Sequence, residues 1–204
     1  MVRQGECLSK IADRYGFFWD ALWNHERNAE LKEKRKNPNV LMAGDQVFIP
    51  EKRIKEESGS TGQVHTFRLK GVPVRLKLRL DNSRGEARAG VPYALDVDGK
   101  KFTGTTGADG LVSVVVPPQS AKAHLRLQTG EEWMLDLGYM NPTDYTSGVQ
   151  ARLKNLGYYT GELNGQLDDA LREALRDYQG NAGLSVTGEP DDATRAALLS
   201  EHGS

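Results

Sequence analysis

Apolar residues follow a helical period at the two ends of the chain and a strand period in its middle. Near the N-terminus, one apolar helical face is built from residues spaced three or four apart: Leu8, Ile11, Ala12 and Tyr15. Gly16 ends this predicted helix, a second helix is predicted from about Trp19 to Trp23, and Val47–Pro50 is predicted to be a short strand ended by proline.

The middle of the chain has the alternation of half-buried strands. Leu76, Leu78 and Leu80 alternate with three basic residues, Arg75, Lys77 and Arg79. Turn dipeptides separate the other predicted strands, with Asp98-Gly99 and Thr129-Gly130 marking hairpins. Those strands are 93–97, 101–105, 111–116, 123–128 and 132–137. Such short, regularly spaced strands predict a small antiparallel sandwich.

Two stretches near the C-terminus repeat each other. Gly165–Leu175 aligns without a gap on Gly188–Leu198, and both copies read Gly, two spacers, Asp-Asp-Ala, one spacer, Arg, one spacer, Ala-Leu. In each copy the Gly permits a turn, and an Asp can accept hydrogen bonds from the first turn of a helix. A third helix precedes them, opened by a capping box of Ser147 and Gln150 and closed at Gly157. The apolar positions of the three helices predict one small bundle: Val149, Leu153, Leu156, Leu171, Leu175, Tyr178, Leu184 and Leu198.

Composition excludes several classes of protein. The 204 residues are 38% hydrophobic and 27% charged, as in an ordinary globular protein. The formal charge of -1 gives no general attraction to nucleic acid, and no apolar run approaches the roughly 20 residues that span a membrane. Cys7 is the only cysteine, so no internal disulfide can form. Met1–Gln4 lacks the apolar core of a secretory signal, so we expect synthesis in the cytoplasm.

The sequence offers no convincing catalytic or metal site. The four histidines, His25, His65, His124 and His202, are not in metal-ligand spacing with Cys, Asp or Glu. Cys7 has no evident base and is predicted to be a half-buried small residue. Glu131 and Glu132 are adjacent in a predicted strand and would point to opposite faces of the sheet. We therefore predict no enzyme, no catalytic residue, no metal and no cofactor.

Three surface features leave two interpretations open. Arg75, Lys77 and Arg79 form either a contact for an anionic polymer or acidic partner, or an ordinary solvated face. The aromatic residues of the N-terminal region, Phe17, Phe18, Trp19 and Trp23, exceed what a small core needs, so some are candidates for a sugar or protein contact. The charged residues of a third feature are typical of an exposed helix, which is either an ordinary solvated face or a binding site: Glu30, Lys32, Glu33, Lys34, Arg35 and Lys36.

The C-terminal stretch resembles the helical peptidoglycan-binding domain that is attached to many cell-wall enzymes. The resemblance rests on Val149-Gln150, Leu153, Leu156–Tyr159, Gly161, Asn164-Gly165, Ala174-Leu175, Tyr178-Gln179, Gly183-Leu184, Thr187-Gly188, Asp191 and Thr194. It implies glycan contacts near Tyr158, Tyr159 and Gln179, whereas Tyr178 is expected in the core. Leu171 stands where the family usually has Thr.

Residues 1–51 resemble a LysM domain. The resemblance rests on Val2, Gly5, Leu8, Ile11-Ala12, Tyr15-Gly16, Leu22, Asn24, Leu41, Gly44-Asp45, Val47 and Ile49-Pro50. It implies a βααβ fold that binds glycans containing N-acetylglucosamine, through Gly5, Glu6, Cys7, Asn24, Val40, Leu41 and Met42. Glu6-Cys7 replaces the usual Asp-Thr, and 26–39 is longer and more charged than the connection that forms one wall of the glycan groove.

The turn residues between Gly90 and Leu111 look like those of transthyretin-like β domains, which are appended to bacterial surface proteins and type VI secretion spikes. The predicted fold is therefore multidomain α+β: a βααβ module at 1–51, a linker at 52–62, an antiparallel β-sandwich at 63–141 and a three-helix bundle at 142–204.

We predict a non-catalytic peptidoglycan-binding protein that serves as an accessory or adaptor for a secreted toxin or an injection spike. A contractile injection system would deliver it to the periplasm or cell wall. The alternative is a structural or interaction protein whose terminal modules bind a toxin, phage tail or baseplate component. A third class, a wall hydrolase with an unrecognised site, would release muropeptides.

Overall fold

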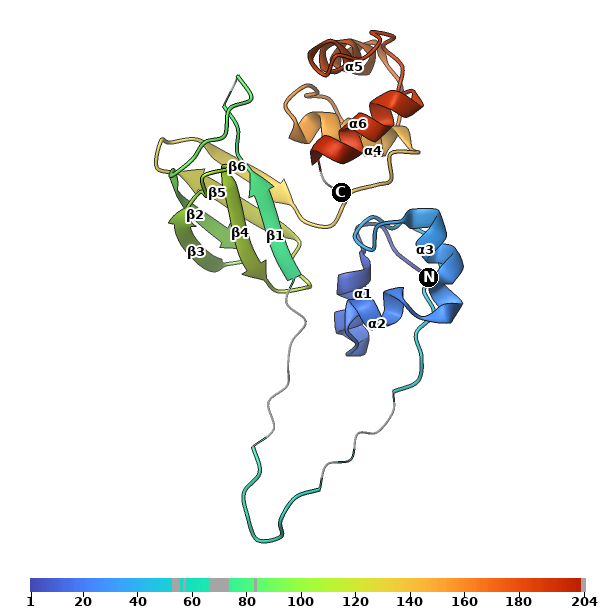
Figure 1. Ribbon diagram of the computed structural model, residues 1–204, viewed down its shortest axis with the longest axis vertical. Helices are drawn as coiled ribbons and strands as arrows, with labels where there is room; N and C mark the ends of the chain where they lie inside the picture. Colours follow the sequence, from blue (N-terminus) through green and yellow to red (C-terminus); the bar gives the residue numbers. More distant parts are fainter. Residues whose placement is uncertain (53–55, 57, 67–73, 83, 203–204) are drawn as a thin grey trace. The chain divides into compact units, whose positions relative to one another are not determined.

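The computed structural model describes residues 1–52, 56, 58–66, 74–82 and 84–202 (Figure 1). Two compact units are distinguished. One contains Met1–Cys7, Glu30–Gln46 and Gly138–Ser204, and the other contains Leu8–Ala29 and Val47–Leu137. Parts of the predicted linker and of the first β segment, 53–55, 57 and 67–73, lie outside the described residues. The fold has helices and antiparallel sheets, which confirms the α+β class, whereas the predicted domain boundaries stay predictions.

The N-terminal region contains both predicted helices. They are α1 (Leu8–Tyr15) and α2 (Trp19–Trp23), and Gly16 ends α1 with a φ of 67°. The buried face of α1 contains Leu8, Ile11 and Ala12, as the spacing predicts, whereas Tyr15, which the same spacing places on that face, is 46% exposed. Of the surplus aromatic residues, Trp23 is buried and Phe18 is exposed, while Phe17 and Trp19 are half-buried.

The strand predicted over 47–50 is wrong, because residues 1–52 contain no β-strand. The side-chain amide of Asn28 takes the place of a neighbouring strand. Its Nδ2 donates to the carbonyl of Phe48 at 2.9 Å, and its Oδ1 accepts from the backbone N–H of Phe48 at 2.7 Å. The backbone of Phe48 is therefore satisfied by a side chain and needs no β ladder.

The first strand of the predicted βααβ module is also missing. Val2 is buried and exchanges two backbone hydrogen bonds with a turn: its N–H donates to Asp45 at 2.8 Å, and its carbonyl accepts from Gly44 at 2.9 Å. This single exchange is too short to form a strand.

The charged stretch after α2 forms a 3-10 helix, η1 (Glu26–Asn28), and α3 (Ala29–Arg35). The expectation that all its charges are exposed is wrong for Arg35, whose side chain is 3% exposed. Its Nε and Nη2 donate to the two carboxylate oxygens of Asp45 at 2.7 and 2.8 Å. This bidentate pair, together with the N–H of Met42 at 2.9 Å from Asp45, closes the turn before residue 46.

The β region forms two antiparallel sheets, as the sequence predicts (Figure 1). The strands are β1 (Val74–Arg79), β2 (Pro92–Val97), β3 (Lys100–Thr105), β4 (Leu111–Val116), β5 (Lys122–Leu127) and β6 (Glu132–Asp136). One sheet pairs β1 with β4, and the other has the order β3-β2-β5-β6. Asp98 and Gly99 have positive φ values of 48° and 87°, which fit the tight β2-β3 hairpin.

An apolar core lies within this β region. The alternation predicted for β1 is confirmed, because Leu76 and Leu78 pack against the core whereas Arg75, Lys77 and Arg79 are exposed. The buried core residues are Leu95, Val97, Val116, Ala123, Leu125 and Leu127.

The C-terminal helices are α4 (Thr146–Asn155), α5 (Asp169–Asn181) and α6 (Asp192–His202). They bury one cluster: Val149, Leu153, Tyr159, Leu171, Ala174, Leu175, Tyr178 and Leu198. Gly157, with a φ of 85°, follows the end of α4 as predicted. The prediction of a capping box is wrong. The helix α4 has no side-chain cap, and Ser147 accepts a hydrogen bond from Asn141 instead.

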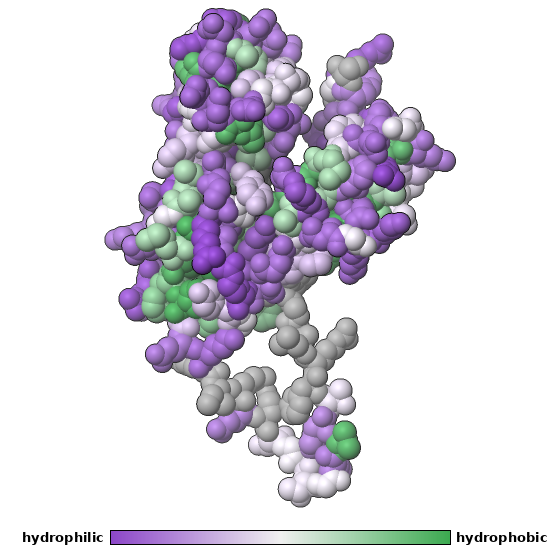
Figure 2. Space-filling model, turned by 180° about the vertical axis from the view of Figure 1, so that it is seen from behind, coloured by the Kyte–Doolittle hydropathy of each residue, from purple (hydrophilic) through white to green (hydrophobic). Residues whose placement is uncertain are grey.

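The face shown in Figure 2 is largely hydrophilic, with smaller apolar areas between the charged ones. In the part of the chain that the structure describes, no helix combines the length and the apolar character that a membrane crossing requires.

Candidate functional site

Gln150, on α4, holds the loop that connects α4 to α5. Its side chain is fully buried, and its Oε1 accepts from the N–H of Gly165 at 2.8 Å. Its Nε2 donates to Asn164 Oδ1 at 2.9 Å and to the carbonyl of Gln166 at 3.0 Å. One amide therefore fixes three consecutive residues of the loop.

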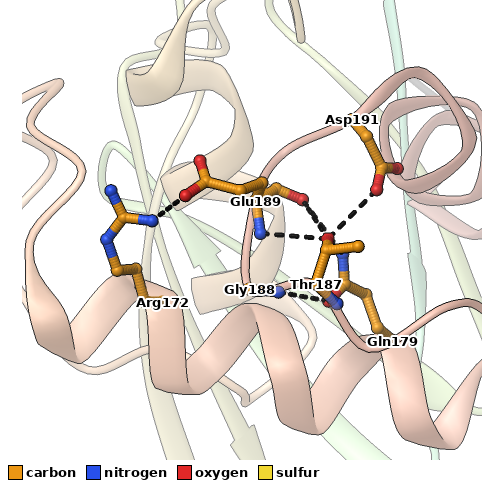
Figure 3. A network of polar contacts seen from close by, with 6 residues as sticks. All are labelled: Arg172, Gln179, Thr187, Gly188, Glu189 and Asp191. Atoms are coloured by element: carbon orange, nitrogen blue, oxygen red, sulfur yellow. Dashed lines mark hydrogen bonds and ion pairs between the residues drawn. The ribbon is translucent and has the colours of Figure 1, made fainter.

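Gln179, on α5, holds the next loop in the same way (Figure 3). Its Oε1 accepts from the N–H groups of Thr187 and Gly188, both at 2.9 Å. Its Nε2 lies 2.9 Å from each of three acceptors: Thr187 Oγ1, the carbonyl of Glu189 and Thr194 Oγ1. Because this amide is fully buried and bonded at both ends, the loop has little freedom to move.

The two loops are thus copies of one local structure. In each, a buried glutamine binds the backbone of a glycine with a positive φ, 76° at Gly165 and 71° at Gly188. Each loop is followed by an aspartate that caps the next helix: Asp168 accepts from Leu171 N and Asp191 from Thr194 N, both at 2.9 Å. The sequence repeat predicted the turn and the cap correctly. We call 162–167 and 185–190 the latched loops.

The second latched loop carries additional polar contacts. Arg172 forms an ion pair with Glu189, and Thr187 Oγ1 donates to Asp191 at 3.1 Å (Figure 3). Hydrogen bonds from the backbone and hydroxyl of Thr194 lower the pKa of Asp191. The carboxylate is therefore kept ionised as a helix cap.

Each latched loop displays one apolar side chain at the same position of the repeat. Leu163 is 47% exposed and Val186 is 59% exposed, each two residues before the latched glycine. An apolar group on a rigid loop with satisfied backbone groups is suited to binding a ligand, because little conformational entropy is lost on contact.

The structure places the C-terminal site residues predicted from the sequence close to this framework. Gln179 holds the second latched loop. Tyr159 is buried, and its hydroxyl donates to the carbonyl of Glu162 at 3.1 Å. Tyr158 is half-buried and packs edge-on against Tyr178, with ring centroids 5.3 Å apart. Burial gives Gln179 and Tyr159 the role of positioning loops, and direct glycan contact by these residues stays a prediction.

The N-terminal site residues differ widely in exposure. Cys7, Val40 and Leu41 are buried, Gly5, Glu6 and Met42 are half-buried, and Asn24 is exposed. All except Asn24 belong to the same compact unit. Their assignment to glycan binding stays a prediction.

Sequence reasoning missed the role of Gln150, which it assigned to a capping box. The available signal was a polar residue between Val149 and Leu153 on the apolar face of a helix, followed by a loop with a turn glycine. Arg152 was also missed. It is fully buried and donates to the carbonyls of Asn141 and Gly148 at 2.8 and 2.9 Å, and burial lowers its pKa to about 10.

Among the described residues, no group of three or more His, Cys, Asp or Glu side chains could hold a metal ion. The two adjacent glutamates have separate partners. Glu131 accepts two hydrogen bonds from Arg88, at 2.7 and 2.9 Å, while Glu132 accepts from Arg126 at 3.1 Å and lies 3.0 Å from His124. The hydrogen bonds from Arg88 and Thr129 lower the pKa of Glu131 to about 2.

Comparison with protein families finds a match in the C-terminal region. Residues 146–198 match the family described as Putative peptidoglycan binding domain. The match begins with α4, covers both latched loops and includes most of α6. The comparisons with curated proteins and with solved structures gave no match. Residues 146–198 are therefore similar to a peptidoglycan-binding domain, which supports peptidoglycan as a partner.

Proposed function

We propose that this protein is a non-catalytic peptidoglycan-binding protein whose residues 146–198 contact the polymer through the latched loops. The observation that carries the proposal is the family match over the segment in which two buried glutamines hold the loops. The matched family is a binding domain, and the proposal needs no chemical step.

The direct test is sedimentation of the purified full chain with isolated sacculi. We expect the protein to pellet with sacculi and to stay in solution without them. A variant with Gln150→Ala and Gln179→Ala, which removes both latches, should lose most of this binding. Glu173→Ala, at an exposed position of α5, is the matched control and should bind normally. A full chain that remains in solution with sacculi would refute the proposal.

The N-terminal region supplies a second glycan contact in this proposal. Its support is the LysM-like pattern of residues 1–51, with Gly5, Glu6, Cys7, Asn24 and 40–42 as the contacting residues. Each small module alone binds weakly, and tethering makes the second contact intramolecular at roughly millimolar effective concentration.

The cellular role that we propose is that of an accessory or adaptor for a toxin or a contractile-injection spike. The protein would be made in the cytoplasm and carried to the periplasm or cell wall by that machine. The support is the resemblance of the β region, between Gly90 and Leu111, to domains appended to such spikes. Co-purification of the native protein with spike components tests this role.

A second candidate function is favoured by one observation in the N-terminal region. Residues 1–52 lack both strands of the LysM fold, and α3 presents four exposed charges: Glu30, Lys32, Glu33 and Lys34. In this alternative the N-terminal region binds a protein rather than a glycan. Sacculus binding that is unchanged by Asn24→Ala together with Met42→Ala would favour it.

A further inference from the structure

The solvent-facing side of the β1-β4 sheet carries a row of positive charges. Arg75, Lys77 and Arg79 are all exposed and alternate with core residues of β1. Successive residues on one face of a strand are roughly 7 Å apart, so the row extends over about 13 Å. We call these three residues the cationic face.

The neighbouring strand does not neutralise this charge. The residues of β4 opposite the cationic face are Val115, Ser113 and Leu111, none of which is acidic. Val115 is itself 43% exposed, so an apolar group lies beside Arg75. Within the described residues, Arg79 pairs with Asp81 at 3.1 Å, while Arg75 and Lys77 have no ion pair. Arg75 donates to a neutral hydroxyl, Ser113 Oγ, at 3.1 Å.

The other sheet has an ordinary solvated face and provides the contrast. There the cations of β5 are opposite carboxylates of β6: Lys122 pairs with Asp136 at 2.8 Å, and Arg126 pairs with Glu132 at 3.1 Å. If the β1-β4 sheet only had to be soluble, its cations could be paired with carboxylates, as they are on the other sheet. The charges of Arg75 and Lys77, which have no ion pair within the described residues, are therefore available to a ligand.

We propose that the cationic face binds the carboxylate groups of peptidoglycan stem peptides. This inference rests on the proposed function, because it names the part of the polymer that the β region recognises. The N-acetylated glycan chain carries no charge, whereas its stem peptides combine carboxylates with alanine methyl groups. The carboxylates complement Arg75, Lys77 and Arg79, and the methyl groups complement Val115.

The test uses the full chain and sacculi at two salt concentrations. The variant R75Q/K77Q/R79Q removes the three charges and keeps the polar alternation of β1. The matched control, R84Q/K100Q/K101Q, removes three exposed charges elsewhere in the β region and gives the same net charge. At about 20 mM salt we expect the first variant to bind roughly tenfold more weakly than the unaltered chain, and the control to bind normally.

At about 0.5 M salt the difference should disappear, because screening is then strong over a few ångströms. It should also disappear on sacculi whose carboxyl groups have been amidated. Equal low-salt binding by the first variant and the unaltered chain would overturn the inference while leaving the proposed function intact. A difference that persists on amidated sacculi would also overturn it, because the cationic face would then not be recognising carboxylates. Failure of the unaltered chain to bind under any condition would instead refute the proposed function.

Discussion

Buried side-chain amides fix the positions of several irregular segments of this chain. Gln150, Gln179 and Asn28 are each buried, and each binds backbone groups of a segment distant in the sequence. A buried polar group left without a partner costs about 1–3 kcal/mol, so each amide strongly favours one loop conformation. The positions of these segments therefore depend on side-chain chemistry more than on local backbone preference.

Replacement of either latch should release only its own loop. In Gln179→Ala, the N–H of Gly188 loses its acceptor, while the N–H of Thr187 keeps only the carbonyl of Ser185 at 3.0 Å. We expect the hydrogen-exchange protection of Gly188 to fall by about 100-fold. Gln150→Ala should do the same at Gly165 and leave Gly188 protected. Amide exchange measured by NMR distinguishes the two variants. Loss of protection throughout α4–α6 in either variant would mean that the latch supports the whole bundle.

The Arg35–Asp45 pair should make the N-terminal turn sensitive to acid. Burial favours the neutral carboxyl of Asp45, but hydrogen bonds from Arg35 and the Met42 amide outweigh it, so its pKa is lowered. A carboxylate with a lowered folded-state pKa stabilises the fold above its unfolded-state value. That stability is lost as the pH falls through the folded-state pKa.

We therefore expect the Met42 amide to lose exchange protection as the pH is lowered below about 4, after correction for intrinsic exchange rates. Asp45→Asn should remove this pH dependence and lower the protection already at neutral pH. Glu33→Gln, at an exposed position of α3, is the control and should retain the acid transition. Equal protection of the Met42 amide in Asp45→Asn and in the unaltered chain at neutral pH would contradict the importance of the pair.

At the scale of elements, the segment 47–50 depends on Asn28 instead of on a strand partner. Asn28→Asp preserves the shape of the side chain but replaces its donor with a carboxylate oxygen. That oxygen would face the carbonyls of Leu22 and Phe48, which now accept from Nδ2 at 2.8 and 2.9 Å. We expect the free energy of unfolding to fall by about 2–4 kcal/mol at neutral pH.

Acid should partly rescue the Asn28→Asp variant. Its new carboxyl should have a raised pKa in the folded state, and protonation restores one donor towards the carbonyls. Its stability relative to the unaltered chain should therefore improve as the pH falls from 7 to about 5. Denaturant unfolding followed by tryptophan fluorescence, with Trp19 and Trp23 in this region, measures the change. If the loss of unfolding free energy relative to the unaltered chain does not vary with pH, this would argue against the carboxylate–carbonyl contact.

The sequence predicted those elements whose periodicity and turn residues agree. The β2-β3 and β5-β6 hairpins, the α1 helix and the three C-terminal helices all combine apolar spacing with glycine or Asx turn signals. It failed at 47–50, where apolar residues resemble a strand but Asn28 satisfies the backbone. It also failed for Arg35 and Gln150, because their partners lie 10 and 15 residues away in turns whose path only the folded structure gives.

At the scale of the whole molecule, we propose that one chain makes several weak contacts with the polymer. The latched loops, the cationic face and the LysM-like region each bind a repeating polymer through a small surface. Their combined affinity then depends on the length of chain between them, because tethering sets the effective concentration of the second contact.

Lengthening the segment before the β region tests this dependence. Insertion of about 24 Gly/Ser residues between Ser58 and Gly59, both exposed, lowers the effective concentration without altering any contacting residue. Because effective concentration falls roughly as the −3/2 power of linker length, we expect binding to sacculi to weaken by about two- to fivefold. Binding of a soluble single-repeat muropeptide should not change, since it engages one module at a time. If binding to sacculi does not change on insertion, the residues on one side of the linker provide the whole affinity.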